Sequence, residues 1–134
     1  MQVPRYWREQ NERYNLVGSS CANCGFTMFP RRTLCPKCRH HSVGKLEDCA
    51  FSGRGAVETW TVVHQAPDSH ALEAPYVLAI VKLDEGPRVT TQIVDIDPST
   101  IEVGMPVAAC FRKLGESGGA GVIHYGYKFG PVRD

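Results

Sequence analysis

The stretch Cys21-Ala22-Asn23-Cys24, followed after ten residues by Cys35-Pro36-Lys37-Cys38, decides the fold of the first part of this chain. Each pair forms a tight turn that presents two sulfur atoms to one metal ion, and the residues between the pairs allow a hairpin that brings both turns together. Gly25 suits the positive φ that such a turn often needs, and Pro36 stiffens the second turn. We therefore predict one zinc ion bound by four ligands: Cys21, Cys24, Cys35 and Cys38.

Two other uses of the cysteines are disulfide bonds and a redox pair. Disulfides need an oxidising compartment, and Met1–Arg5 shows no apolar signal segment, so we expect a cytoplasmic protein. A redox Cys-x-x-Cys occurs once, at a helix start, and not twice in a hairpin. Four thiolates leave no open position for water, so the zinc is expected to be structural. Cys49 and Cys110 are interpreted as incidental or buried thiols.

The composition indicates a soluble globular protein with no membrane-spanning segment. The net charge of +1 argues against a protein that binds nucleic-acid phosphates. Residues 15–46 contain no Asp or Glu, but they contain five cations: Arg31, Arg32, Lys37, Arg39 and Lys45. Part of this positive charge is expected to balance the zinc thiolates, and the rest is available to bind a phosphate.

An amphipathic helix is predicted over residues 4–15. Pro4 is suited to a helix start, Glu9 and Arg13 have i,i+4 spacing, and an apolar stripe carries three aromatic residues, Tyr6, Trp7 and Tyr14. The ordinary partner of such a stripe is the protein's own core. The alternative is a groove on another protein, which makes Tyr6, Trp7 and Tyr14 candidate partner-binding residues.

Five strands are predicted after the ribbon, and a helical turn near Asp97 separates the third from the fourth. They cover residues 57–64, 76–83, 88–94, 107–112 and 122–129. This pattern is typical of an OB-type barrel, with an SH3-like barrel as the competing interpretation. The fold class is thus mainly β, with an N-terminal helix (residues 1–20), a zinc ribbon (21–48) and a five-stranded barrel (49–134).

Two strands allow more detailed expectations. In 57–64, strict alternation places Val57, Thr59, Thr61 and Val63 on one face. The nearly unbroken apolar run 76–83 predicts a strand covered on both sides. Gly53 and Gly55 allow the sharp coiling that the first strand of a barrel needs.

Catalytic motifs are lacking, so we predict no catalytic residues and no enzyme activity. His64 near Asp68 is better interpreted as a solvated loop histidine than as an acid/base pair. Glu58 and His124 are expected on the barrel surface.

Several segments in order carry a resemblance to a known family. They are Tyr6-Trp7-Arg8, Leu16–Ser19, Phe29-Pro30-Arg31, Cys35–Cys38, Gly55–His64, Ala74-Pro75-Tyr76, Gly104–Val107 and Tyr125–Val132. The chain resembles, nearly end to end, the zinc-ribbon/OB-fold family associated with thiolase-type enzymes, a domain-of-unknown-function family. The resemblance implies a rubredoxin-like ribbon, an OB barrel, no catalytic activity of its own and an association with acyl-CoA enzymes.

The archaeal members of that family imply a more specific function. They bridge acetoacetyl-CoA thiolase and 3-hydroxy-3-methylglutaryl-CoA (HMG-CoA) synthase of the mevalonate pathway, so that the intermediate passes along a shared CoA site; others are subunits of thiolase-like aldolases or acyltransferases. The basic ribbon fits such a scaffold. Its candidate contacts to CoA or acyl-CoA phosphates are Arg31, Arg32, Lys37 and Arg39, for which the alternative role is solubility and zinc counter-charge.

The alternative from another class is a single-stranded nucleic-acid binder, because OB barrels with exposed aromatics often bind single strands. Trp60 is the candidate stacking residue. Residues 53–134 contain ten acidic and seven basic side chains, which makes the barrel a poor groove for phosphates. We therefore favour the scaffold. An independent acyl-CoA hydrolase or transferase would require turnover by the isolated chain, which we do not expect.

Overall fold

Two short helices begin the part of the chain that the structure describes, residues 3–133 of a computed structural model. The segment contains two helices, α1 (Val3–Arg8) and α2 (Gln10–Asn15). The predicted helix over residues 4–15 is therefore confirmed as helical, but the prediction of one continuous helix is wrong. The break lies at Glu9, whose φ of −97° and ψ of 17° depart from helical values. Leu16, with a φ of 51°, ends α2 in the left-handed conformation.

Met1, Gln2 and Asp134 belong to the predicted helical segment and barrel but lie outside the described residues.

The ribbon is a three-stranded antiparallel sheet. Strand β1 (Val17–Cys21) lies between β2 (Thr27–Met28) and β3 (Leu46–Ala50). β1 pairs with β3 along its whole length, from Val17 opposite Ala50 to Cys21 opposite Leu46. A 3-10 helix, η1 (Arg39–Ser42), follows the second cysteine pair. Cys21 ends β1, Cys24 follows it, and Cys35 and Cys38 lie in the connection between β2 and β3. The four cysteines therefore meet at one end of the sheet.

Five strands close into a barrel in the spatial order β4-β5-β6-β8-β7. They are β4 (Arg54–Val63), β5 (Tyr76–Leu83), β6 (Arg88–Ile93), β7 (Pro106–Glu116) and β8 (Ile123–Pro131). Neighbours are antiparallel except β6 and β8, which are parallel. The 3-10 helix η2 (Asp68–Glu73) follows β4, and η3 (Pro98–Thr100) lies between β6 and β7. The predicted OB-type topology is confirmed, including the helical turn between the third and fourth strands.

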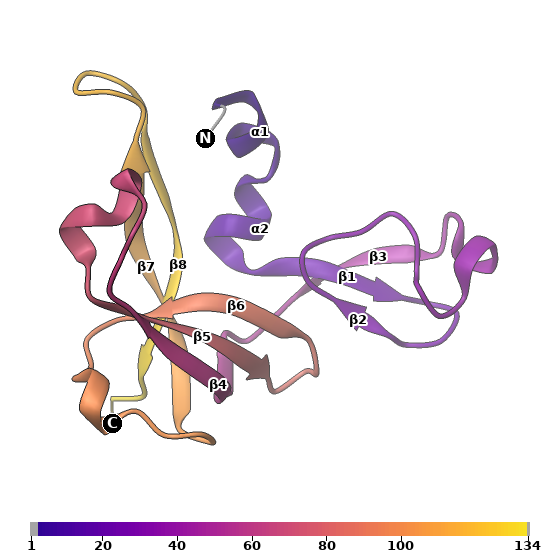
Figure 1. Cartoon of the computed structure of the whole chain (residues 1–134). Coiled ribbons are helices and arrows are strands. Elements are labelled where there is room, and N and C mark those ends of the chain that lie inside the picture. The colour runs from indigo at the N-terminus through magenta and orange to yellow at the C-terminus, as the bar shows by residue number, and fades with distance from the viewer. Residues whose placement is uncertain (1–2, 134) are drawn as a thin grey trace.

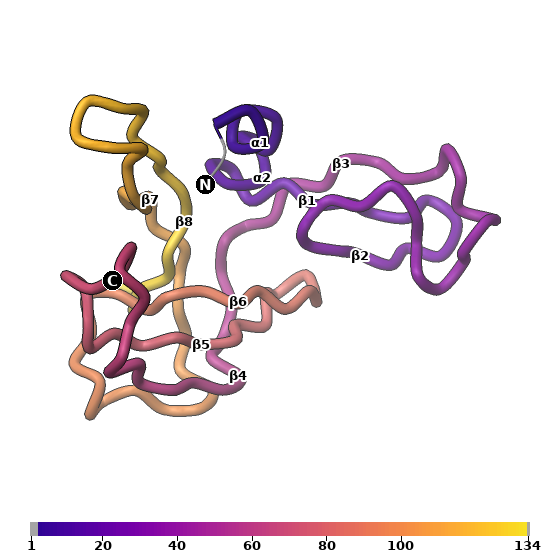
Figure 2. Tube along the Cα trace, turned by 45° about the horizontal axis from the view of Figure 1, so that its top comes forward, coloured from indigo at the N-terminus to yellow at the C-terminus, as the bar shows by residue number. Residues whose placement is uncertain are grey.

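The ribbon projects to one side of the barrel, and helices α1 and α2 lie between the ribbon and the β7–β8 hairpin (Figures 1 and 2). The helices thus contact the barrel through β8 and the ribbon through β1. In residues 3–133, no helix is long and apolar enough to cross a membrane.

One apolar core fills the barrel and continues toward the ribbon. Its fully or nearly fully buried members are Leu16, Phe51, Val57, Val77, Ala79, Val81, Leu83, Val89, Ile93, Ile101, Val107 and Phe129. Burial of aliphatic and aromatic groups of this size is the main stabilising term of a small barrel. Leu16 and Phe51 flank the ribbon sheet in sequence, so the core also fixes the ribbon to the barrel.

Strand β4 departs from the predicted alternation. A bulge between Val57 and Thr59 shifts its register with β5, so Val57 is buried in the core whereas Thr59 and Thr61 are exposed. The prediction that Val57, Thr59, Thr61 and Val63 share one face is therefore wrong, because the bulge separates Val57 from the other three. β4 also begins at Arg54, and β7 continues to Glu116, so both strands are longer than predicted.

Strand β5 was predicted to be covered on both sides, and this is also wrong. Its residues alternate, with Val77, Ala79, Val81 and Leu83 buried and the intervening side chains half-buried or exposed. The reason is that its outer row faces an open groove instead of a packed layer, and Tyr76 and Leu78 line that groove.

Candidate metal centre and the grooves beside it

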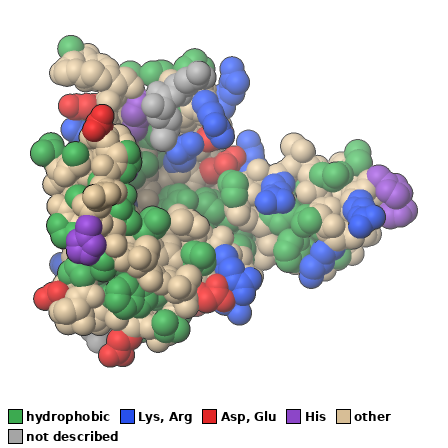
Figure 3. All heavy atoms as spheres, in the orientation of Figure 1, with side chains coloured by type: hydrophobic (Ala, Val, Ile, Leu, Met, Phe, Trp, Pro, Cys, Tyr) green, Lys and Arg blue, Asp and Glu red, His purple; other side chains and the backbone are tan. Residues whose placement is uncertain are grey.

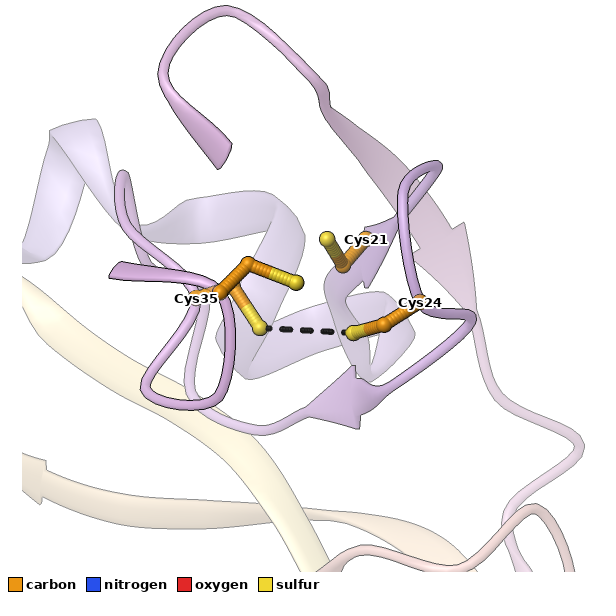
Figure 4. A group of neighbouring side chains, drawn as sticks. Cys21, Cys24 and Cys35 are labelled. Atoms are coloured by element: carbon orange, nitrogen blue, oxygen red, sulfur yellow. Dashed lines mark hydrogen bonds between the residues drawn. The ribbon is translucent and has the colours of Figure 1, made fainter. Parts of the chain in front are cut away.

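The four cysteines meet at the end of the ribbon. Their sulfur atoms all lie within 4.8 Å of one another, and the Cys24 and Cys35 sulfurs are 3.6 Å apart. A tetrahedral zinc site with Zn–S bonds of about 2.3 Å places its sulfurs about 3.8 Å apart. Cys21, Cys24 and Cys35 point toward one another from two separate turns (Figure 4). The geometry therefore fits one zinc ion.

The two cysteine turns have the same backbone construction. The N–H of Gly25 donates to the Cys21 carbonyl at 2.7 Å, and the N–H of Arg39 donates to the Cys35 carbonyl at 2.8 Å. Both donors have positive φ, 74° for Gly25 and 51° for Arg39. The prediction for Gly25 is confirmed, whereas a left-handed Arg39 is not visible in the sequence because non-glycine residues seldom adopt it.

Four thiols at these distances cannot all ionise easily. For Cys24, a backbone hydrogen bond from Phe26 favours the thiolate, but hydrogen bonding to the neighbouring sulfurs and desolvation outweigh it and raise its pKa to about 12. For Cys35, burial opposes ionisation, but the backbone N–H groups of Cys38 and Lys37 lower its pKa to about 7. A divalent cation removes this conflict because it stabilises all four thiolates.

A complete set of four sulfur ligands makes this a structural site, with no position left for water or substrate. The ribbon's own apolar cluster of buried residues is small: Cys21, Met28 and Cys35. Such a cluster is too small to fold the ribbon by burial alone, so its stability depends on the metal.

Two buried serines support the metal turns, although no sequence motif marks them. Ser42 Oγ accepts from the Cys35 N–H at 2.9 Å and donates to the Arg39 carbonyl at 2.6 Å. Ser19 Oγ exchanges hydrogen bonds with the backbone of Arg32. Serine is common in loops, and only the fold brings these hydroxyls to the backbone groups that they satisfy.

The larger groove, of about 830 Å³, lies where the helices, the ribbon and the barrel meet. Its walls come from α1 and α2, ribbon residues 29–31 and strands β5, β6, β7 and β8. The lining contains five cations (Arg5, Arg13, Arg31, Arg88 and Lys128) and two carboxylates (Glu9 and Glu12). Figure 3 shows this face hollowed between the barrel and the helices, with charged side chains along the helix side.

A smaller groove, of about 510 Å³, lies between the first cysteine turn and the turn that joins β5 to β6. Thr27 Oγ1 donates to the Glu85 carbonyl at 3.1 Å, which joins the ribbon to that turn. Phe29 and Arg88 line both grooves, so the two are neighbours along the ribbon–barrel junction.

The four basic candidates lie in three different places. Arg31 lines the larger groove and pairs with Glu12 and Asp48, each at 3.4 Å. Arg32 and Lys37 line the smaller groove, where the Lys37 ammonium lies 4.4 Å from the centre of the Phe26 ring. Arg39 is exposed at the start of η1 and lines neither groove. The fold therefore brings only Arg32 and Lys37 together.

The three aromatic candidates also differ in exposure. Tyr6 is 4% exposed and packs on His124, with ring centres 4.5 Å apart. Tyr14 is half-buried against Phe111. Trp7 is 72% exposed and is the one of the three that remains available to a partner. His124, expected on the barrel surface, is instead 4% exposed because α1 covers it, and that expectation is wrong.

His64 and Asp68 are both exposed, and within residues 3–133 no hydrogen bond joins them. Glu58 is exposed and forms a two-pronged ion pair with Arg88, with one contact at 2.9 Å. Two other histidines have hydroxyl partners: Ser117 Oγ lies 2.8 Å from His124 Nε2, and Ser69 Oγ lies 2.8 Å from His70 Nδ1.

A metal-stabilised ribbon followed by a five-stranded OB barrel is the class of protein that the fold and the cysteine site define. Residues 10–43 match the family model of the ChsH2 rubredoxin-like zinc ribbon domain, and residues 49–112 match that of the ChsH2 C-terminal OB-fold domain. The chain belongs to the DUF35 family of zinc-ribbon/OB-fold proteins.

Two archaeal relatives cover nearly the whole chain. A DUF35 domain-containing scaffold protein of Methanocaldococcus jannaschii is 49% identical over 98% of this chain and 92% of its own. Another of the same description, from Methanothermobacter thermautotrophicus, is 51% identical over 95% of this chain and 94% of its own. A solved structure, the Ltp2-ChsH2(DUF35) aldolase, is 30% identical with a TM-score of 0.71 over 98% of this chain and 96% of that chain.

Proposed function

We propose that this protein is a non-catalytic scaffold that binds two acyl-CoA enzymes, acetoacetyl-CoA thiolase and HMG-CoA synthase, and helps to form a shared CoA site between them. The observation that carries the proposal is the near full-length similarity to archaeal proteins described as scaffolds.

Trp7 is the proposed partner contact. It is 72% exposed on α1, the same helix that buries Tyr6 against the barrel, so the tryptophan is held in place by a packed neighbour. Exposed tryptophans on a rigid element are frequent hot spots of protein interfaces. Tyr6 and Tyr14 pack edge-on with ring centres 6.1 Å apart, which joins α1 to α2.

Arg32 and Lys37 are the proposed contacts to the phosphates of CoA. They lie together in the smaller groove, and within residues 3–133 neither forms an ion pair with a carboxylate. Arginine binds phosphate oxygens in a two-pronged fashion, and lysine adds a point charge. Arg31 and Arg39 lie outside this groove, and their positive charge attracts the CoA phosphates only from a greater distance.

The similarity to the ChsH2(DUF35) chain of an aldolase favours a second candidate function. In this second function, the chain would be a subunit of a thiolase-like aldolase and would bind one catalytic partner. The two functions differ in the enzyme that binds the chain, so the identity of the partner separates them.

The test is binding of the purified, zinc-loaded chain to purified acetoacetyl-CoA thiolase and HMG-CoA synthase by calorimetry. Trp7→Ala is expected to weaken binding by about thirtyfold, which corresponds to about 2 kcal/mol. Because Trp7 is exposed, its replacement should change the free energy of unfolding by no more than about 0.5 kcal/mol.

Trp60→Ala is the matched control, since Trp60 is the other tryptophan and lies on β4, with 37% exposure. It should bind as the wild type does. Equal loss in both variants, or no binding of either enzyme by the wild type, would contradict the proposal.

A further inference from the structure

Lys128 is a buried cation in the lining of the larger groove. It lies on β8, its side chain is 9% exposed, and its ammonium donates to Glu73 Oε1 at 3.1 Å. Removing an ammonium from water is costly unless an anion faces it. The groove therefore contains one site at which an anion is required.

The anion that now faces Lys128 is the carboxylate of Glu73. Glu73 ends η2, in the connection between β4 and β5, and its side chain is 36% exposed. Its second oxygen accepts from Gln92 Nε2 at 3.0 Å. Burial alone would raise the pKa of Glu73, but the hydrogen bonds from Gln92 and Lys128 outweigh it and lower the pKa. Glu73 is thus an ionised partner that solvent can reach.

Three of the other four groove cations are well exposed, and the fourth, Arg13, is 24% exposed and already pairs with Glu9 at 2.6 Å. Arg5, Arg31 and Arg88 have side chains that are 72%, 43% and 61% exposed. Water solvates such groups well, so their ion pairs contribute little and they do not need a ligand. Lys128 is the cation for which a bound anion makes the largest difference.

The lining of the groove is mixed. Its apolar part includes Tyr76, Leu78, Val89, Leu114 and Tyr127, and its polar part includes Thr90, Thr91 and Gln92. Tyr127 is half-buried, and its ring packs edge-on against Phe29 and Phe129. The apolar part of this lining suits a hydrocarbon chain.

We propose that the larger groove binds an amphiphilic carboxylate, an organic acid with a hydrocarbon chain, whose carboxylate replaces Glu73 as the partner of Lys128. The chain of the acid lies against the apolar lining. One ion pair is exchanged for another, and no covalent bond forms. This site is distinct from the proposed CoA phosphate contacts, Arg32 and Lys37, and does not depend on the scaffold function.

The test is calorimetric titration of the full, zinc-loaded chain with octanoate. Lys128→Met should weaken octanoate binding by at least about tenfold, because it removes a charge-assisted hydrogen bond. Lys113→Met is the matched control, since Lys113 is 51% exposed on β7 and pairs with Glu116; it should bind as the wild type does. Octanol, which has the chain but no charge, should bind at least about tenfold more weakly than octanoate.

Glu73→Gln gives the decisive second result. The amide retains the shape and the hydrogen bond to Gln92 but no longer competes as an anion for Lys128, so octanoate should bind severalfold more tightly. If the Lys128–Glu73 ion pair is only structural, Glu73→Gln should not raise the affinity for octanoate. Unchanged affinity in Lys128→Met, no gain in Glu73→Gln, or equal binding of octanol and octanoate would overturn the proposal. Circular dichroism of each variant checks that the fold is kept.

Discussion

Cys24 is exposed, whereas Cys21 and Cys35 are completely buried. Replacing Cys24 therefore removes one metal ligand with little change in packing. Cys24→Ser is expected to release the zinc and unfold the ribbon, because the free energy of metal binding is the ribbon's folding free energy. The barrel, which has its own core, should keep its circular dichroism signal. Zinc content and thermal unfolding measure the two effects.

Cys49→Ser is the control, since Cys49 is a half-buried thiol on β3 outside the cage. It should retain one zinc ion per chain. A Cys24→Ser protein with full zinc content and an unchanged melting profile would show that the cysteines do not form the structural site.

Gly55 is the residue at which the barrel tolerates no side chain. A Cβ there would collide with the carbonyl oxygen of Lys82 on the paired strand, and would lie 2.9 Å from Val81 Cγ1. Both are parts of the packed β4–β5 pair, so neither can move away easily. Gly55→Ala should lower the free energy of unfolding by at least about 1 kcal/mol.

Gly115→Ala is the comparison for Gly55→Ala, because nothing lies within 4 Å of a Cβ at Gly115. Chemical denaturation of both variants should give a loss at Gly55 and little change at Gly115. Equal midpoints for the two would disprove the close packing of β4 on β5.

At the scale of the elements, the two N-terminal helices are linked by the carboxylate of Glu9. Glu9 pairs with Arg13 at 2.6 Å and Arg5 at 3.1 Å, and these hydrogen bonds, Arg13 first, lower its pKa below the ordinary 4.5. A lowered pKa in the folded state means that the stabilisation is complete above pH 4.5 and is lost as the pH falls through the folded pKa.

The pH dependence gives a prediction for Glu9→Gln. Its melting temperature should be lower than that of the wild type at neutral pH, and the two should converge as the pH falls below 4.5. Glu102→Gln is the control, because Glu102 is exposed and forms no ion pair within residues 3–133. A constant difference at all pH values would show that the ion pairs of Glu9 do not stabilise the helices.

The sequence predicted the elements whose signals are local. Cysteine spacing located the metal turns, and alternating apolar residues with glycine and proline breaks located five strands in the correct order. It missed the bulge after Val57 and the burial of His124. These depend on pairing between distant segments: β4 with β5, and α1 with β8. The pair Lys128–Glu73 joins residues 55 positions apart, so no local pattern indicates it.

At the scale of the whole molecule, the ribbon, the helices and the barrel are joined into one surface with two grooves. Phe29 of the ribbon packs edge-on against Phe51 and against Tyr127 of β8. The same residue lines both grooves, so the position of the ribbon on the barrel determines their shape. Metal binding, which stabilises the ribbon, therefore also affects the shape of both grooves.

We propose that the chain holds two acyl-CoA enzymes together without catalysing a reaction. Sedimentation velocity of purified acetoacetyl-CoA thiolase and HMG-CoA synthase, with and without the zinc-loaded chain, tests it most directly. We predict one faster-sedimenting species containing all three proteins when the chain is present, and two separate enzymes when it is absent or lacks zinc. Two enzymes that sediment separately in the presence of the zinc-loaded chain would contradict the account.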